Sequence, residues 1–269
     1  MIKLEHTIEL SPDQMMFVIE GMRNPMNSWD KSDSYNGHYC KKCGHIDRDG
    51  SCKPGDIERE SCYKHYGLEL GHNDKTLMKK LAKAGTDHRK FMRMMPVYVR
   101  ITAPLYWWKE FDTYKVGTVA NSCSTMHKIQ AKEFTLDDFS YEHLYSKGTP
   151  TRNDNGKTFE DELCSELGFD HIGALMGVIK SLNWAREDYI KHKNKGDWWQ
   201  MIQLLPSSYN QTRNVMLNYE VLYNIYHARK NHKLDEWRDF CEWILSLEFS
   251  YLIEDGVVHT LNKNIDHAI

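Results

Sequence analysis

The first third of the chain alternates between the hydrophobic patterns of strands and of helices. Apolar and polar residues alternate over residues 2–10, which predicts a half-buried strand. Ser11, Pro12 and Gln14 follow as an N-cap, a proline in the first helical turn and a capping-box partner, so a helix is expected to about Arg23. The same reasoning predicts a helix over 73–84, capped by Asn73-Asp74, and a strand over 96–102.

Beyond residue 102 the apolar positions recur mainly at helical spacing. The expected helices are 103–116, 135–146, 159–167, 170–192, 196–204, 211–232 and 234–253, with a short strand at 256–260. Because few strands accompany many helices, the predicted fold class is α+β, dominated by helices and with a small antiparallel sheet.

Polar residues interrupt the apolar face of the helix expected over 211–232. At about 100° per residue, Asn218 and Arg229 point in the same direction, and His232 and Glu236 lie within about 40° of them. They share this stripe with apolar residues, whereas a solvated face would be separate from the apolar one. The stripe indicates a lined site; the alternative is an interhelical hydrogen-bond network in the core of an oligomer.

Composition limits the classes of function. The chain has 269 residues, of which 41% are hydrophobic, so one domain spanning residues 1–269 is expected. The net charge of −3 gives no basic surface for a nucleic acid polymer or an anionic membrane. No apolar stretch approaches the roughly 18 residues of a membrane span, and the N-terminus has no secretion signal. A cytoplasmic protein without a membrane partner is therefore expected.

One segment, residues 32–66, contains almost no aliphatic residues and is predicted to be an insertion without an apolar core. It holds four of the seven cysteines, namely Cys40, Cys43, Cys52 and Cys62. The C-x-x-C pair suits half of a tetrahedral site, and four thiolates would order the segment around a structural zinc. The alternative is a flexible loop that is metal-free or redox-active.

Two parts of the chain carry motifs in a recognisable order. Ala103-Pro104 opens a helix that leads to Thr113-Tyr114-Lys115 and then to a small polar loop with Ser124. The later part contains Leu205-Pro206, Arg213, Asn218, Asn224 and Arg229, with the arginine eleven residues after the first asparagine. In these motifs the chain resembles the flavin-dependent thymidylate synthases, over roughly two thirds of its length.

The resemblance implies a fold and a chemistry. A homotetramer would bind FAD between subunits and transfer a methyl group to deoxyuridine monophosphate (dUMP), giving thymidylate, with methylenetetrahydrofolate and NADPH as co-substrates. Arg229 would polarise the uracil ring and Ser124 would position the nucleotide, as the catalytic pair. The resemblance places Tyr114, Lys115, Asn218, Asn224 and His232 at the flavin, and Asn121, Ser122, Ser124, Arg213 and Arg229 at the nucleotide.

The chain departs from the family at cationic positions. The family's Arg-His-Arg triplet falls on Thr113-Tyr114-Lys115, which keeps one cation, and Met126 or Thr125 replaces the arginine of the following loop. Lysine neutralises a phosphate as a point charge but lacks the planar fork of arginine. Two alternatives therefore remain: a related flavin and folate enzyme acting on another pyrimidine nucleotide, and a non-catalytic oligomeric relative that binds nucleotides.

Overall fold

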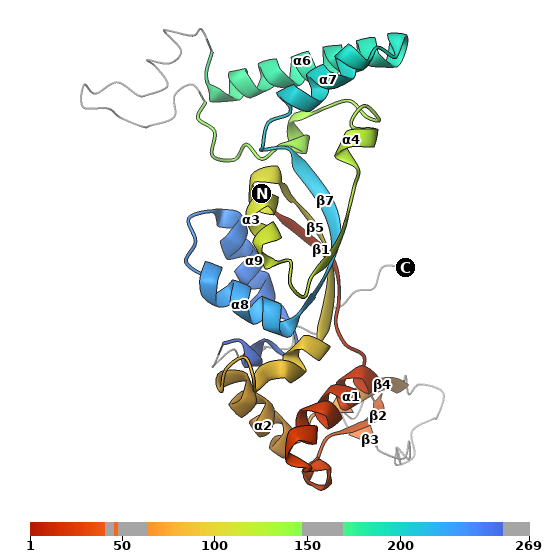
Figure 1. Ribbon diagram of the computed structural model, residues 1–269, viewed down its shortest axis with the longest axis vertical. Helices are drawn as coiled ribbons and strands as arrows, with labels where there is room; N and C mark the ends of the chain where they lie inside the picture. Colours follow the sequence, from red (N-terminus) through yellow and green to blue (C-terminus); the bar gives the residue numbers. More distant parts are fainter. Residues whose placement is uncertain (41–45, 48–63, 147–168, 255–269) are drawn as a thin grey trace, which may run out of the picture. The chain divides into compact units, whose positions relative to one another are not determined.

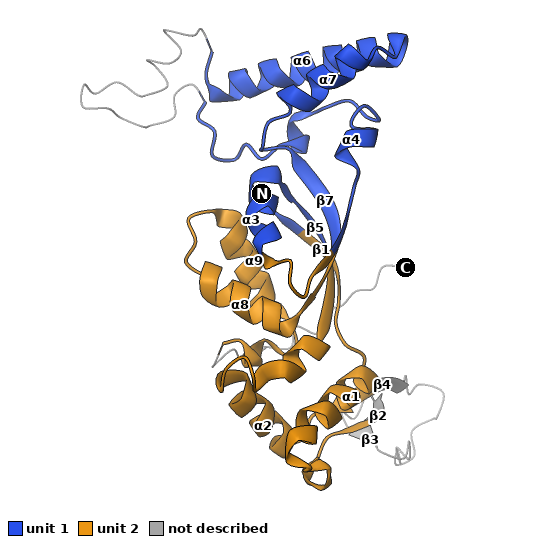
Figure 2. Ribbon diagram, in the orientation of Figure 1, with its two compact units in different colours: residues 1–3, 100–113, 120–214 blue, residues 4–99, 114–119, 215–269 orange. Residues whose placement is uncertain are grey.

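The computed structural model describes residues 1–40, 46–47, 64–146 and 169–254. The chain divides into two compact units (Figure 2). Unit 1 comprises residues 1–3, 100–113 and 120–214, and unit 2 comprises residues 4–99, 114–119 and 215–269. The predicted single domain over 1–269 stays a prediction.

Helices dominate the fold, and the predicted α+β class is confirmed. One sheet has four strands in the order β1-β5-β7-β6 (Figure 1). Its strands are β1 (Lys3–Ile8), β5 (Pro96–Pro104), β6 (Val119–Ser122) and β7 (Asn210–Asn218). In β5, Val97, Val99 and Ile101 are buried and alternate with exposed Tyr98 and Arg100, which confirms the period-two strand predicted there.

Unit 1 consists mainly of helices around its own apolar cluster. Its helices are α3 (Leu105–Phe111), α4 (Thr125–Lys128), α6 (His171–His192) and α7 (Lys195–Leu204), with the 3-10 turn η6 (Leu136–Asp138). The helices predicted over 170–192 and 196–204 are confirmed. The buried cluster contains Ile129, Phe134, Phe139, Leu175, Ile179, Leu182 and Met201.

Unit 2 contains the helices α1 (Pro12–Arg23), α2 (His72–Lys83), α8 (Tyr219–Arg229) and α9 (Asp235–Ser246), with short 3-10 turns η1 (Asn24–Met26), η2 (Trp29–Lys31), η4 (Arg89–Met94) and η7 (Ser250–Leu252). Turn η4 contacts α1, α2 and α8, and its residues Phe91 and Met92 are buried. The Ser11 capping box on α1 is confirmed, with Gln14 as its partner. Helix α2 begins after Gly71, so the predicted Asn73-Asp74 cap is wrong.

The helix predicted over 211–232 is wrong in its first half. Residues 210–218 form strand β7, where buried Val215 and Leu217 alternate with partly or fully exposed neighbours. The idea of one polar helix face fails with it, because Asn218 caps α8, Arg229 ends it and His232 follows it. The helix predicted over 135–146 is also wrong, because only the turn η6 forms there.

The segment 32–66 begins and ends in a second sheet that the sequence did not predict. Strands β2 (Tyr35–Cys40), β3 (Ile46–Asp47) and β4 (Lys64–Glu69) pair antiparallel in the order β3-β2-β4. Cys40 ends β2, whereas Cys43, Cys52 and Cys62 lie outside the described residues, as does the predicted zinc site that needs them. Within the described ranges, no cluster of three or more histidine, cysteine or acidic residues suits a metal ion.

A buried carboxylate fixes the start of this segment. Asp74 accepts hydrogen bonds from Arg23 Nε at 2.5 Å, from Ser32 Oγ at 2.8 Å and from Ser34 Oγ at 2.7 Å. Burial acts to raise the pKa of Asp74, but these hydrogen bonds outweigh it and hold the pKa below its usual range. Asp74 therefore joins α1 and α2 to the chain entering β2.

Candidate functional site

Arg229, the last residue of α8, lies in a cluster of unit 2 that three predicted site residues form. Its Nε donates to the Tyr114 hydroxyl at 2.9 Å, and its Nη1 lies 3.0 Å from His232 Nε2. The guanidinium also lies over the Trp237 ring, 4.8 Å from its centroid. Such contacts hold the planar cation in one orientation. The structure therefore brings Tyr114, Arg229 and His232 together.

The imidazole of His232 faces two donors. Its Nδ1 accepts from the Leu234 backbone N–H at 3.2 Å, and its Nε2 faces Arg229 Nη1. A neutral imidazole has a single nitrogen lone pair, so it accepts from only one of these donors at a time.

Asn218 fixes the loop that follows Tyr114. Its Oδ1 accepts from the Val221 N–H at 3.0 Å as the N-cap of α8, and its Nδ2 donates to the Gly117 carbonyl at 3.3 Å. Gly117 has φ of 84°, and a Cβ there would lie 2.9 Å from Asn218 Nδ2. Only glycine fits this close approach without strain. Two other predicted flavin residues, Lys115 and Asn224, are exposed.

The remaining predicted residues lie in unit 1. Asn121 and Ser122 are exposed on β6, and Ser124 caps the short helix α4, where its Oγ accepts from the His127 N–H at 3.1 Å. The Ser124 hydroxyl proton remains available for an acceptor, because a hydroxyl donates and accepts at once.

Arg213 is already engaged in unit 1. Its Nη1 pairs with Asp112 at 3.0 Å, its Nε donates to Gln211 at 3.0 Å, and the guanidinium covers the Trp108 ring at 4.1 Å. Gln211 in turn donates to Thr125 Oγ1 at 2.9 Å. A phosphate ligand would therefore compete with the Asp112 carboxylate for Arg213.

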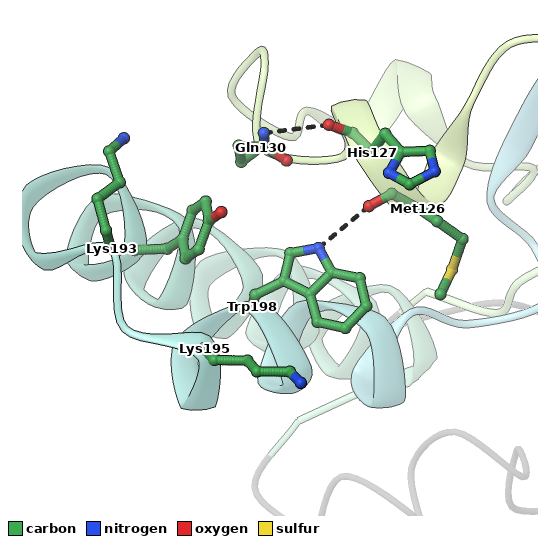
Figure 3. A pocket seen from close by; sticks show the side chains of 7 residues that line it. Met126, His127, Gln130, Lys193, Lys195 and Trp198 are labelled. Carbon is green, nitrogen blue, oxygen red and sulfur yellow. Dashed lines mark hydrogen bonds between the residues drawn. The ribbon is translucent and has the colours of Figure 1, made fainter.

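A cavity of about 320 Å³ in unit 1 was not predicted (Figure 3). It is lined by Met126, His127, Gln130, Tyr189, Lys193, Lys195 and Trp198. The only sequence signal is the Lys-Asn-Lys run at 193–195 after a long helix, which reads equally well as a solvated turn. The lining residues come from α4 and the residues after it, and from the junction of α6 and α7.

Comparison with known proteins gives the fold. No family model matches the chain, and no curated protein matches it in sequence. The chain is similar to a crystal structure of thymidylate synthase X from Helicobacter pylori with FAD and dUMP, at 15% identity and a TM-score of 0.53, over 96% of this chain and 99% of that chain. A second Helicobacter pylori structure, a flavin-dependent thymidylate synthase complexed with FAD and dUMP, gives 16% identity and a TM-score of 0.51, over 94% and 98%.

A third similar structure is a UMP/dUMP methylase, PolB, from Streptomyces cacaoi bound with 5-Br dUMP. It is 12% identical, with a TM-score of 0.51, over 91% of this chain and 88% of that chain. Together these similarities show that the chain has the fold of the flavin-dependent thymidylate synthases.

Proposed function

We propose that this protein is a flavin-dependent methyltransferase that converts dUMP into thymidylate, with methylenetetrahydrofolate as the one-carbon donor and NADPH as the reductant. One observation carries the proposal. Arg229, which the motif spacing assigns to the pyrimidine, is held by Tyr114 and His232 in a fold similar to that of enzymes solved with FAD and dUMP.

The residues near Arg229 fit a flavin. FAD presents carbonyl and ring-nitrogen acceptors and a diphosphate, which call for neutral donors and a cation. Asn224 supplies an exposed amide, Lys115 an exposed ammonium and His232 an imidazole. Tyr114, Lys115, Asn218, Asn224 and His232 are therefore assigned to FAD, which supplies hydride transfer when bound.

Arg229 acts on the pyrimidine through its charge. A guanidinium aimed at a ring carbonyl stabilises the negative charge that develops on that oxygen as the ring is attacked. Tyr114 and Trp237 fix the guanidinium before the nucleotide arrives, so little reorganisation is needed during the reaction. His232 Nε2 lies 3.0 Å from Arg229 Nη1, and this close approach limits the rotation of the guanidinium.

Ser124 and its neighbours position the nucleotide. The Ser124 hydroxyl donates to a nucleotide oxygen while its Oγ accepts from the backbone of α4. Asn121 and Ser122 offer an exposed amide and an exposed hydroxyl from β6. Arg213 supplies the cation for the phosphate and exchanges its Asp112 partner for it.

The proposal is tested with purified protein, FAD, NADPH, methylenetetrahydrofolate and dUMP. We expect flavin absorbance that NADPH bleaches, and thymidylate detected by mass. Arg229→Ala should lower kcat/KM for dUMP at least a hundredfold, within the range for loss of an oxyanion-stabilising donor, with FAD retained. The matched control is Arg100→Ala, an exposed arginine of β5, which should stay within twofold of wild type. Protein that takes up no FAD and makes no product refutes the proposal.

A second candidate function is methylation of another pyrimidine nucleotide. It is favoured by Met126 or Thr125 at the position of a phosphate-binding arginine of the family, and by the similarity to a UMP/dUMP methylase. Parallel assays with dUMP, UMP and dCMP separate the two, because turnover of UMP without turnover of dUMP would retire the thymidylate assignment.

Assembly and metal content complete the proposal. We infer a homotetramer from the resemblance to the flavin-dependent thymidylate synthases. Light scattering that gives a monomer mass would overturn it. We also infer structural zinc at the four cysteines of residues 32–66, and zinc-free protein after gentle purification would overturn that.

A further inference from the structure

Gln211 on β7 joins two parts of unit 1 through one side-chain amide. Its Oε1 accepts from Arg213 Nε at 3.0 Å. Its Nε2 donates to the Cys123 carbonyl at 3.2 Å and to Thr125 Oγ1 at 2.9 Å, and these two residues flank Ser124 in the sequence. The amide therefore holds the Arg213 cation and, at the same time, the Ser124 loop that the last three residues form.

The orientation of this amide follows from the chemistry of its partners. Arg213 Nε has only a hydrogen to donate, and the Cys123 carbonyl has only lone pairs to accept with. Exchanging the oxygen and the nitrogen of Gln211 would place donor against donor at Arg213 and acceptor against acceptor at Cys123. The oxygen of Gln211 therefore belongs to the cation and its nitrogen to the loop.

The backbone around Gln211 is held by the same surroundings. Its carbonyl accepts from Trp108 Nε1 at 2.9 Å, and the Trp108 ring also carries the Arg213 guanidinium, 4.1 Å from its centroid. The next carbonyl, that of Thr212, accepts from the Cys123 N–H at 3.0 Å, just beyond the end of β6, which pairs with β7 (Figure 1). Gln211 is therefore a fixed point between the cation and the loop.

Arg213 has a second partner of a different kind. Asp112 pairs with Nη1 of Arg213 at 3.0 Å, and the side chain of Asp112 is 44% exposed. A partly exposed ion pair contributes little free energy, so an oxyanion that approaches Arg213 replaces Asp112 at small cost. The bond to Gln211 uses Nε, a different edge of the guanidinium, and does not have to break in this exchange.

We propose that Gln211 is a positioning residue that couples Arg213 to the Ser124 loop, so that both hold one nucleotide together. This inference rests on the proposed function, which assigns Arg213 to the phosphate and Ser124 to a nucleotide oxygen. Gln211 acts through these two groups and makes no contact with the nucleotide. Because it orders them before the ligand arrives, less conformational entropy is lost on binding.

Steady-state kinetics of the FAD-loaded protein with dUMP test the coupling. Gln211→Leu keeps a side chain of similar size and removes all three of its hydrogen bonds. We expect the KM for dUMP to rise about tenfold, the scale of a lost hydrogen bond to a charged group, while kcat stays within twofold because Arg229 is unchanged. The matched control Asn214→Leu removes an exposed amide of the same strand and should leave both constants within twofold.

Asp112→Asn separates coupling from simple support of Arg213. This variant removes the charge that competes with the phosphate and keeps an oxygen acceptor, so the KM for dUMP should stay at the wild-type value or fall below it. An equal rise of KM in Asp112→Asn and Gln211→Leu would show that both residues merely hold Arg213, and it would overturn the proposal.

The exposed thiol of Cys123 reports on the loop without turnover. We expect iodoacetamide to label Cys123 at least threefold faster in Gln211→Leu than in wild type, because the loop loses two hydrogen bonds. Gln211→Glu keeps an acceptor for Arg213 but has no donor for the loop, so Cys123 should react as fast as in Gln211→Leu. Peptide mapping identifies the labelled thiol, and thermal unfolding verifies that each variant is folded.

Two further results would overturn the proposal. One is an active enzyme whose KM for dUMP is unchanged in Gln211→Leu. The other is a joint loss of kcat and Tm in Gln211→Leu with unchanged labelling of Cys123, which would mark Gln211 as a purely structural residue. Absence of any thymidylate from the wild type refutes the proposed function, whereas an unchanged KM in an active variant refutes the coupling alone, so the two failures are distinguishable.

Discussion

Replacing Asp74 by asparagine should lower the free energy of unfolding of unit 2 more than replacing an exposed residue does. The side chain of Asp74 is fully buried, and its partner Arg23 has a side chain only 4% exposed. Asparagine keeps the shape but leaves the Arg23 cation buried without an opposite charge. Breaking such a pair by removing one partner costs about 3–5 kcal/mol. Urea unfolding followed by circular dichroism measures the loss.

The control and the double variant make this prediction specific. Asp30→Asn changes an exposed carboxylate on η2 and should cost less than about 0.5 kcal/mol. The double variant Arg23→Met/Asp74→Asn has no unpaired charge. Its loss of unfolding free energy should therefore be smaller than the sum of the losses in the two single variants, by at least about 1 kcal/mol. Strict additivity, or a loss below about 1 kcal/mol for Asp74→Asn, would refute the buried-pair reasoning.

The pH dependence has a defined sign. Because the pKa of Asp74 in the folded state lies below its ordinary value of 3.8, the unfolded chain binds the proton more readily. The stability from this group is therefore complete above about pH 5 and is lost as the pH falls through the folded-state pKa. Asp74→Asn should lack this component, so its stability should fall less steeply in acid than that of wild type.

Three further outcomes follow from particular contacts. Tyr114→Phe removes the acceptor of Arg229 Nε and should lower kcat/KM for the nucleotide about tenfold, with an unchanged value arguing against this contact. Lys193→Gly relieves a left-handed residue and should stabilise the protein by about 1 kcal/mol; a lower Tm would contradict it. Burial raises the pKa of the Cys241 thiol to about 11, so iodoacetamide at pH 8 should label exposed Cys123 and spare Cys241 in peptide mapping, and equal labelling would disprove this.

Local signals predicted the elements that depend on neighbouring residues. The capping box of Ser11 and Gln14 lies within one turn, and the structure forms it as predicted. Strand β5 followed from the alternation of Val97, Val99 and Ile101, because a period of two leaves little choice of element. Where the pattern was local and unambiguous, the sequence was sufficient to predict the element.

Tertiary pairing decided the elements that were predicted wrongly. The run Val215-Met216-Leu217 suits a helix or a strand, and its place beside β5 in the sheet selects the strand. Asp74 has the residue type of a helix cap, yet the buried cation of Arg23, 51 residues away, takes its carboxylate. Neither partner can be identified from the local sequence.

The candidate site also contains residues that local sequence predicted and residues whose roles depend on tertiary packing. The motif spacing predicts Asn218 and Arg229 as site residues, and that stays a prediction. Their expected common helix face is wrong, because Asn218 caps α8 and Arg229 ends it. Trp237, Gln211 and the cavity residues were missed because their roles arise from packing between distant segments. Motif spacing predicts site residues, whereas the side-chain contacts that orient them become visible only in the fold.

The departure from the family's Arg-His-Arg triplet has a physical reading in this structure. Tyr114 stands where the triplet has histidine, and its hydroxyl accepts from Arg229 while its ring meets Trp237 edge-on at 5.9 Å. A neutral acceptor at this position orients the Arg229 cation, whereas a second cation would repel it. Under the proposed function, the change therefore exchanges a charge for a better-fixed Arg229, and Arg213 supplies the charge for the nucleotide phosphate. Tyr114→His should accordingly weaken Arg229-dependent turnover as the pH falls below the usual pKa of histidine, and turnover that does not depend on pH between 5.5 and 8 would exclude this exchange.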